Sequence, residues 1–254
     1  MPIYDQVRKL GRKAIRTDSR TLRLTEYLTP ALPPAPAAVG WAHGIRQYGV
    51  LMNDNLGDCV PAAKGHAIQI FTANSSTEAN ITDAMALQDY EICCGYNPAD
   101  PSTDQGGIIL DNLNLWQKGT GGYTGHKLTA FASATVSNLV EIRQAIALFG
   151  GVYIGLNIPQ YALPGDGTIP PVWDVNPNAD NTIIGGHCVF ICAFSPYALT
   201  AITWGQLQPM TWAFWNAFVD EAFCLISPDW IRKNGGAPNG FNLAALESDL
   251  AKIV

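Results

Sequence analysis

Apolar residues in the first half of the chain recur at the three- and four-residue spacing of helices that bury one face. This pattern predicts three helices, over residues 60–72, 83–93 and 108–118. Pro61 suits the first turn of the first helix, and Gly119 ends the third. Asn138 and Glu141 have the spacing of a capping box before a fourth helix, which stops at Gly150.

The second half of the chain changes to short apolar runs bounded by Gly, Pro and Asn, the pattern of buried strands. The expected strands cover residues 152–158, 188–194, 199–203 and 223–226. Helices followed by strands indicate an α+β protein with two lobes. With 254 residues, of which 48% are apolar, the chain is long enough to bury a large core.

The N-terminal residues have a different character. Residues 5–16 place Val7, Leu10 and Ala14 on one face at helical spacing, which predicts an amphipathic helix. Residues 27–41 contain four prolines and are expected to form an extended tether. We therefore divide the chain into an arm and tether, residues 1–38, and a compact domain, residues 39–254.

Charge follows the same division. The net charge is −6, yet the first 26 residues carry +4 and the remainder −10. An acidic body argues against a core that binds nucleic acid, whereas the basic arm suits an acidic partner, a membrane surface, a nucleic acid or a neighbouring subunit. A basic helix that is simply solvated is the alternative interpretation.

The six cysteines show no paired C-x-x-C spacing, so neither a structural zinc site nor any other cofactor is predicted. Residues 188–205 lack charge, but Ser195 and Pro196 divide them, which favours two buried strands over a membrane span. No apolar run of signal-peptide length follows the N-terminal charges. We expect a cytoplasmic or virion-associated protein without a disulfide framework.

Cys59 is the candidate nucleophile. It follows a Gly-containing loop and stands at the first turn of the predicted helix 60–72, with Asp58 near the N-cap. The N-terminus of a helix carries a partial positive charge, which favours a thiolate over a thiol. A buried cysteine that only packs would occupy the same position, and both interpretations remain open.

His187 is the candidate base, 128 residues after Cys59. It follows two glycines and opens an apolar strand, so another lobe or a substrate can approach it closely. A structural histidine whose ring is satisfied within the core is the alternative. The pairing with Cys59 favours the chemical role.

The order of these residues resembles the papain family of cysteine proteases. Trp41 precedes Cys59 at the family's spacing, and Asn53 stands six residues before Cys59, where the family has an oxyanion-hole glutamine. The similarity extends over about residues 39–230. It implies a two-lobe papain-like fold, with a helical N-terminal lobe, an antiparallel sheet or barrel in the C-terminal lobe and an N-terminal extension.

The same resemblance assigns roles to further residues. Gly106 and Gly107 are similar to the glycine-rich wall beside the family's cleft, and Trp204 belongs to a Trp-Gly element that follows the histidine. These three are expected to contact a peptide or protein substrate, although Trp204 also suits a core position. Asn53 and the Cys59 amide are expected to hold the oxyanion.

One departure concerns the third catalytic residue. Ile202 stands where the family has the asparagine that orients the imidazole. The third catalytic residue is therefore absent, is Thr203 through a shifted register, or comes from elsewhere in the chain. A second, milder departure is Val60, where papain has an aromatic residue. The arm is also too short to resemble the inhibitory pro-segments of secreted relatives, so no zymogen processing is predicted.

Three functions remain open at this point. The first is a cysteine peptidase in which Cys59, His187, Asn53 and Thr203 are catalytic. The second is an inactive papain-fold protein, for example of a phage virion, whose residues 1–38 make homo- or hetero-oligomer contacts. The third is another Cys–His acyl-transfer enzyme, such as an NlpC/P60-like amidase or a transglutaminase-like enzyme; the Trp-Gly element favours papain.

Overall fold

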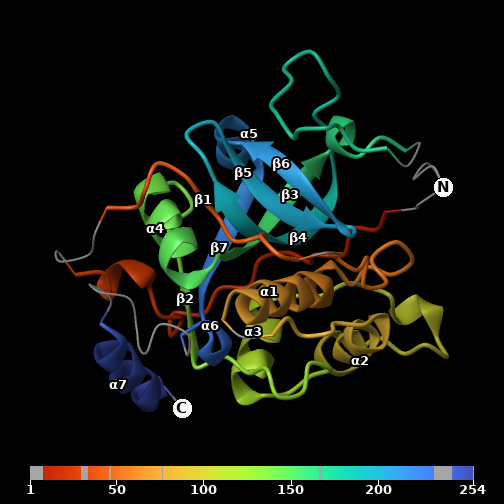
Figure 1. Cartoon of the computed structure of the whole chain (residues 1–254). Coiled ribbons are helices and arrows are strands. Elements are labelled where there is room, and N and C mark those ends of the chain that lie inside the picture. The colour runs from red at the N-terminus through yellow and green to blue at the C-terminus, as the bar shows by residue number, and fades with distance from the viewer. Residues whose placement is uncertain are drawn as a thin grey trace.

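The computed structural model describes residues 8–29, 34–45, 47–75, 77–165, 168–231 and 242–253. Its helical lobe consists of α1 (Cys59–Ser75), α2 (Asp83–Cys94), the short helix η2 (Pro101–Thr103) and α3 (Ile109–Lys118). In Figure 1 these helices lie below a sheet, and the N-terminal segment, drawn in red, runs along the line where the two lobes meet.

The second lobe is built on a seven-stranded antiparallel sheet in the order β2-β7-β3-β4-β5-β6, with β1 paired to β4. The strands are β1 (Val39–Gly40), β2 (Ala130–Ser133), β3 (Val152–Pro159), β4 (Ile183–Phe194), β5 (Ala198–Thr203), β6 (Gln206–Thr211) and β7 (Val219–Ile226). Five further elements surround it: η1 (Leu24–Glu26), α4 (Leu139–Phe149), η3 (Gln160–Ala162), α5 (Trp212–Phe218) and α6 (Pro228–Ile231). The last helix, α7 (Leu243–Ile253), packs beside β2.

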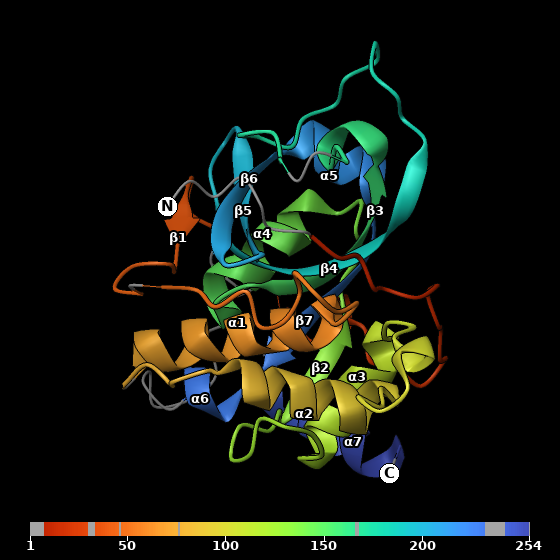
Figure 2. The same ribbon diagram turned by 90° about the vertical axis from the view of Figure 1, so that its right-hand side faces the viewer.

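Two hydrophobic cores lie on opposite faces of this sheet. Successive strand residues point to opposite faces, so on β3 Ile154 enters the core shared with α4 and α5, while Tyr153 enters the core shared with α1. On β4, Val189 and Phe190 divide in the same way. Figure 2 shows α1 lying along the sheet, which brings the start of α1 next to β4.

Most predicted elements are confirmed. The first three helices and the strands β3, β4, β5 and β7 lie where the sequence places them. Gly119 ends α3 in the left-handed conformation, and Asn138 caps α4 by accepting from the Glu141 amide. The sequence missed β2, β6, α5 and α7 as elements.

The predicted helix over residues 5–16 is wrong for residues 8–16, which form an extended strand-like segment; residues 5–7 lie outside the described residues. Backbone pairing with Gly186 of β4 and with Gly107 and Asn53 of two loops replaces the internal hydrogen bonds of a helix. Just after this segment, Leu22, Leu24 and Tyr27 are buried in the core shared with α4. The arm therefore packs on the domain instead of projecting into solvent. Among the described residues no helix has the length and apolarity to cross a membrane.

Candidate active site

Cys59 is the first residue of α1, a helix with a buried surface along most of its length. The Asp58 carbonyl accepts a hydrogen bond from the Ala62 amide at 3.0 Å, which starts the helix at this point. Pro61 fits the first turn because its missing N–H would have no helical partner there. This arrangement fixes the sulfur at the positive end of α1, and Cys59 is only 1% exposed.

His187 lies inside β4, which begins at Ile183. The sequence had suggested that the strand begins at the histidine. Its ring stacks on Trp204, with centroids 4.4 Å apart and planes 14° from parallel. Nε2 is hydrogen bonded to Oγ1 of Thr203 at 2.7 Å. Nδ1 is buried and has no hydrogen-bond partner among the described residues, so it is the nitrogen that remains for chemistry.

The strand register explains why Thr203, and not Ile202, contacts the imidazole. Ile202 pairs with Phe190 and enters the core shared with α1. Thr203, one residue further, points to the opposite face of the sheet, where the His187 ring lies. A hydroxyl thus occupies the position next to Nε2 that the family's asparagine would hold.

Trp204 is held over the ring by a turn between β5 and β6. Its φ angle is 46°, an uncommon value for a residue with a side chain, and Gly205 follows at 75°. Trp173 packs edge-on against the indole at 6.1 Å. Trp204 therefore shields one face of the imidazole, and its Nε1 donates to the Lys9 carbonyl at 3.3 Å.

Residues 9–13 of the N-terminal segment lie between Gly186 of β4 and Gly107 in the loop before α3. The amides of Gly11 and Arg12 both donate to the Gly186 carbonyl, at 3.2 and 3.0 Å. On the other side, the Lys13 amide donates to the Gly107 carbonyl and the Gly107 amide to the Gly11 carbonyl, each at 2.8 Å. The segment thus bridges the loop before α3 and the strand that carries His187.

The fit around Gly11 leaves no room for a side chain. A Cβ added to Gly11 would lie 1.7 Å from the Gly57 carbonyl oxygen, and one added to Gly106 would lie 1.9 Å from the Gly11 carbonyl oxygen. Gly106 also has a φ of 76°, which favours glycine. The predicted substrate contacts Gly106, Gly107 and Trp204 all touch the chain's own N-terminal segment.

Burial controls the protonation of both candidate catalytic groups in this closed arrangement. It raises the pKa of Cys59 to about 12, against a smaller opposing effect of hydrogen bonds from the Cys188 and Gly11 amides. Burial, with a smaller contribution from the charge of Arg12, lowers the pKa of His187 to about 3. Near neutral pH the covered site therefore holds a thiol and a neutral imidazole.

Asn53 lies in the loop before α1 and is 2% exposed. Its side-chain amide donates to the Leu56 carbonyl at 3.1 Å, and its own carbonyl accepts from the Lys9 amide at 3.0 Å. Burial raises the pKa of the neighbouring Asp58 well above its usual value, against a smaller opposing effect of a hydrogen bond from the Asn53 side chain. The Asn53 amide therefore interacts with both Leu56 and Asp58.

The Arg12 side chain lies in an acidic pocket of the sheet, which the sequence analysis did not find. Nη1 bonds Glu221 at 3.0 Å, and Nη2 bonds Asp220 at 2.8 Å and the Asn157 carbonyl oxygen at 2.9 Å. Only 3% of the Arg12 side chain is exposed. Two adjacent carboxylates at the start of the apolar strand β7 were the signal available in the sequence.

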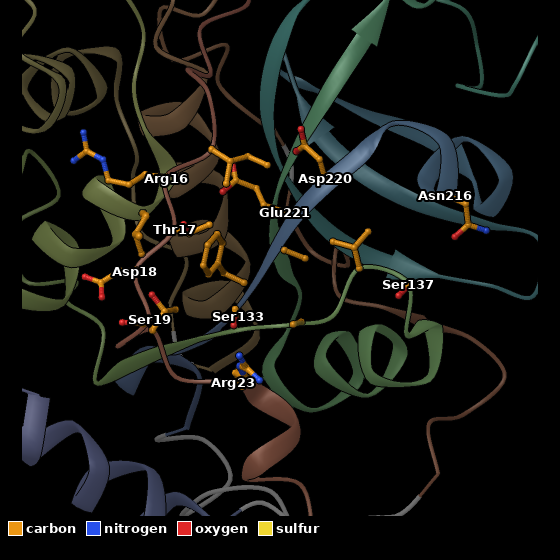
Figure 3. Close-up of a pocket in the computed structure, with 17 residues that line it drawn as sticks. Arg16, Thr17, Asp18, Ser19, Arg23, Ser133, Ser137, Asn216, Asp220 and Glu221 are labelled. Atoms are coloured by element: carbon orange, nitrogen blue, oxygen red, sulfur yellow. The ribbon is translucent and has the colours of Figure 1, made fainter.

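A cavity of about 700 Å³ adjoins this pocket. In Figure 3 residues Arg16 to Ser19 of the N-terminal segment lie along one side, and Asp220 and Glu221 of β7 lie at its upper edge. Residues of the β2–α4 connection form another part of its wall. The cavity shares Asp220 and Glu221 with the pocket that Arg12 occupies. No group of His, Cys, Asp and Glu within the described ranges is arranged to hold a metal ion.

This architecture is the papain-like fold, with a helical lobe and an antiparallel sheet lobe. Xylellain, a cysteine protease from Xylella fastidiosa, superimposes with a TM-score of 0.69 at 14% identity, over 86% of this chain and 97% of that one. Procathepsin B S9 from Trypanosoma congolense gives 0.59 at 11% identity, over 89% of both chains.

Procathepsin L 3 from the larval midgut of Tenebrio molitor gives a TM-score of 0.55 at 9% identity, over 88% of this chain and 77% of that one. At such identities the similarity shows the fold. No family model matches the sequence, and no curated protein matches it.

Proposed function

We propose that this chain is a cysteine peptidase in which Cys59 is the nucleophile, His187 is the base and acid, and Thr203 positions the imidazole. The observation that supports this assignment best is the state of the His187 ring. Its Nε2 is held by Thr203, one face is covered by Trp204, and its buried Nδ1 has no hydrogen-bond partner among the described residues. An imidazole with one nitrogen hydrogen bonded and the other without a partner suits directed proton transfer.

The proposed reaction assigns one step to each of these residues. His187 Nδ1 takes the Cys59 proton, and the sulfur forms a bond to the carbonyl carbon of the substrate amide. The Cys59 amide and the side-chain amide of Asn53, turned away from Asp58, stabilise the oxyanion. The imidazolium then protonates the leaving amine as the C–N bond breaks, and water, deprotonated by His187, hydrolyses the thioester and restores the thiol.

The conformation described here is the closed form of this enzyme. Residues 9–13 cover the nucleophile, and the Gly11 amide rather than a peptide carbonyl carbon contacts the sulfur. When the segment leaves, water reaches both side chains, and the burial that favours the neutral pair is reduced. The pKa of Cys59 then falls and that of His187 rises, which favours the thiolate and imidazolium.

Alkylation of the full-length protein tests the assignment. The variant Arg12→Ala removes the side-chain anchor of the segment, and iodoacetamide with peptide mapping reports each of the six cysteines separately. We expect Cys59 to become the fastest-reacting cysteine, with a rate that changes little between pH 6 and 8 because the thiolate is already formed. The same variant should also cleave peptides in a chymotryptic digest of casein.

His187→Ala in the Arg12→Ala background is the matched control. It should restore the ordinary rise of alkylation rate with pH at Cys59 and abolish peptide cleavage. If Cys59 in the opened protein reacts no faster than Cys93, which is only partly buried, the peptidase assignment is wrong.

A second candidate is a non-catalytic papain-fold protein that uses its cleft to hold a chain segment. The pairing of the N-terminal segment with Gly107 and Gly186 favours it. In that case Cys59 would keep a raised pKa even after Arg12→Ala, and no peptide would be cleaved.

A further inference from the structure

The pocket that holds Arg12 has the composition of a recognition site for a guanidinium group. Three oxygen acceptors from β3 and β7, on Asn157, Asp220 and Glu221, surround the two terminal nitrogens at 2.8–3.0 Å. The Asn157 amide also donates to Asp220 Oδ2 at 2.8 Å, which fixes that carboxylate. These acceptors lie in the directions of the planar donors of arginine.

Charge makes the pocket selective for a cation. Burial raises the pKa of Glu221, and the charge of Arg12 is the main influence that opposes this increase. Without a cation, two neighbouring carboxylates would lie in a largely desolvated pocket, where an unpaired charge is strongly unfavourable. Asp220 Oδ1 is also buried without a partner among the described residues, so the pocket has unused acceptor capacity.

The shape of the pocket depends on a missing side chain in β3. A Cβ added to Gly155 would lie 2.7 Å from Arg12 Cδ and 2.6 Å from Glu221 Oε1. Gly155 therefore provides the channel through which the aliphatic part of the arginine reaches the carboxylates. A bulkier residue at this position would close the pocket to any long side chain.

The backbone contacts at Arg12 do not depend on its side chain. Gly107 and Gly186 pair with main-chain atoms of residues 11–13, and any extended peptide offers the same groups. Selectivity must then come from the side chain that points between the strands. Arg12 occupies the position next to Cys59 and His187 that a substrate residue would take.

We propose that Gly155, Asn157, Asp220 and Glu221 form the specificity pocket of this cleft, and that it selects peptides with an arginine where Arg12 now lies. This inference rests on the proposed peptidase function and names its substrate class. Lysine should bind more weakly, since a single ammonium group cannot reach the three acceptors in the same geometry. The adjoining cavity gives the rest of the peptide space beside β7.

A binding experiment without catalysis tests the pocket directly. The full-length variant Cys59→Ala/Arg12→Ala has an emptied pocket and no nucleophile. A fluorescein-labelled peptide with the sequence of residues 8–16 is titrated by fluorescence polarisation, together with versions carrying lysine, citrulline or leucine at the position of Arg12. We expect arginine to bind at least about tenfold tighter than citrulline, which keeps the shape and removes the charge.

Two variants of the pocket and one control sharpen the result. Glu221→Gln should reduce the preference for arginine over citrulline by about tenfold, in line with a lost charge-assisted hydrogen bond, and Gly155→Val should remove binding of all long side chains. Asp174→Asn removes a carboxylate that bonds Thr211 at the surface and should change nothing.

The outcomes separate this inference from the function on which it rests. Equal affinity for the arginine, citrulline and leucine peptides overturns the pocket, even if Cys59 is shown to be a nucleophile. Selective arginine binding together with an unreactive Cys59 overturns the peptidase and leaves an arginine-reading cleft. If the Glu221→Gln variant keeps the full preference for arginine, the carboxylates are not the source of selectivity and the proposal is wrong.

Discussion

Two buried cation–carboxylate clusters in this protein have similar chemistry and different construction. In the helical lobe, Lys64 of α1 lies 2.7 Å from Asp89 of α2, and both side chains are at most 1% exposed. Asp89 is further satisfied by Asn112 and by the Gly122 amide. In the cleft, Arg12 meets Asp220 and Glu221 from a segment more than 200 residues away in sequence.

The difference shows that the partner of a buried carboxylate can be a fixed part of the core or a group that another molecule can replace. All partners of Asp89 belong to elements packed within one lobe, so the cluster cannot open without disrupting that lobe. Arg12 belongs to an extended segment held by backbone pairing and by its own side chain, and the side chain of Asp220 is 26% exposed beside a cavity. We therefore interpret the first cluster as structural and the second as a contact that a substrate can replace.

The largest effect is expected from the helical lobe. Lys64→Met leaves Asp89 as a buried charge without its cation and should lower the free energy of unfolding by about 3–5 kcal/mol. Urea denaturation followed by tryptophan fluorescence measures this. The double variant Lys64→Met/Asp89→Leu is the control and should recover most of the loss; a loss below about 1 kcal/mol for the single variant would contradict a structural role.

Arg12→Ala should have a smaller effect on global unfolding and a larger effect on the segment. Once the segment lifts, water reaches Asp220 and Glu221, so the penalty is limited to the free energy that keeps the cleft closed, about 2–3 kcal/mol. Amide hydrogen exchange of residues 9–13 should accelerate accordingly. Arg16→Ala, which removes a largely exposed ion pair with Asp111, is the matched control and should leave these amides protected.

Acidification should also open the cleft. His187 has a pKa of about 3 when covered, below the ordinary value of 6.5, so between these pH values only the open form takes up its proton. Stability of the closed form is fully present above pH 6.5 and falls as the pH drops toward 3, by up to about tenfold in the opening equilibrium for each pH unit.

Burial raises the pKa of Glu221 in the closed form, so this group acts in the opposite direction: the closed form binds its proton more readily than the open form. Exchange of the amides of residues 9–13, corrected for intrinsic rates, measures the opening. His187→Gln should reduce the pH dependence, and an unchanged pH profile in that variant would exclude His187 as its source. His66 of α1 is a second buried histidine, and burial lowers its pKa to about 4. The described part of the N-terminal segment does not cover it, so a His66→Gln variant is the comparison for His187→Gln.

The smallest effect concerns Thr203. Thr203→Val leaves Nε2 of His187 without its partner and should lower stability by about 1 kcal/mol, while Thr203→Ser retains the hydroxyl and should lose less. In the opened Arg12→Ala background, the valine variant should also reduce turnover without changing the apparent affinity for peptide. Equal turnover in the serine and valine variants would show that the hydroxyl does not position the ring.

The elements whose local signals agree with the fold were predictable from sequence. The helix ends at Gly119 and Asn138 follow from capping chemistry, which acts within a few residues, and apolar β3 and β4 follow from their composition. β6 was missed because Gln206–Thr211 contains Pro209 and several polar residues, which an edge strand tolerates.

The N-terminal segment shows why local spacing was insufficient. Residues 8–16 have helical periodicity, but Gly11 fits between Gly57 and Gly106, and pairing with Gly186 provides hydrogen bonds that a helix would otherwise make internally. Position 203 was only one of several alternatives until the register of β4 and β5 placed its hydroxyl on the imidazole. Asp220 and Glu221 can be recognised as a binding site only through their contact with Arg12, and no short-range sequence pattern predicts that contact.

The burial of Leu22 and Leu24 sets the effective concentration of the N-terminal segment at the cleft. These residues hold the chain to the core ten and twelve positions after Arg12, so a displaced segment stays tethered close to the pocket it has left. A short tether acts as a local ligand concentration in the millimolar range. A free peptide must compete with this tethered segment for the pocket. Cutting the chain between residues 13 and 21 would therefore lower the occupancy of the pocket by Arg12 more than a moderate rise in peptide concentration does.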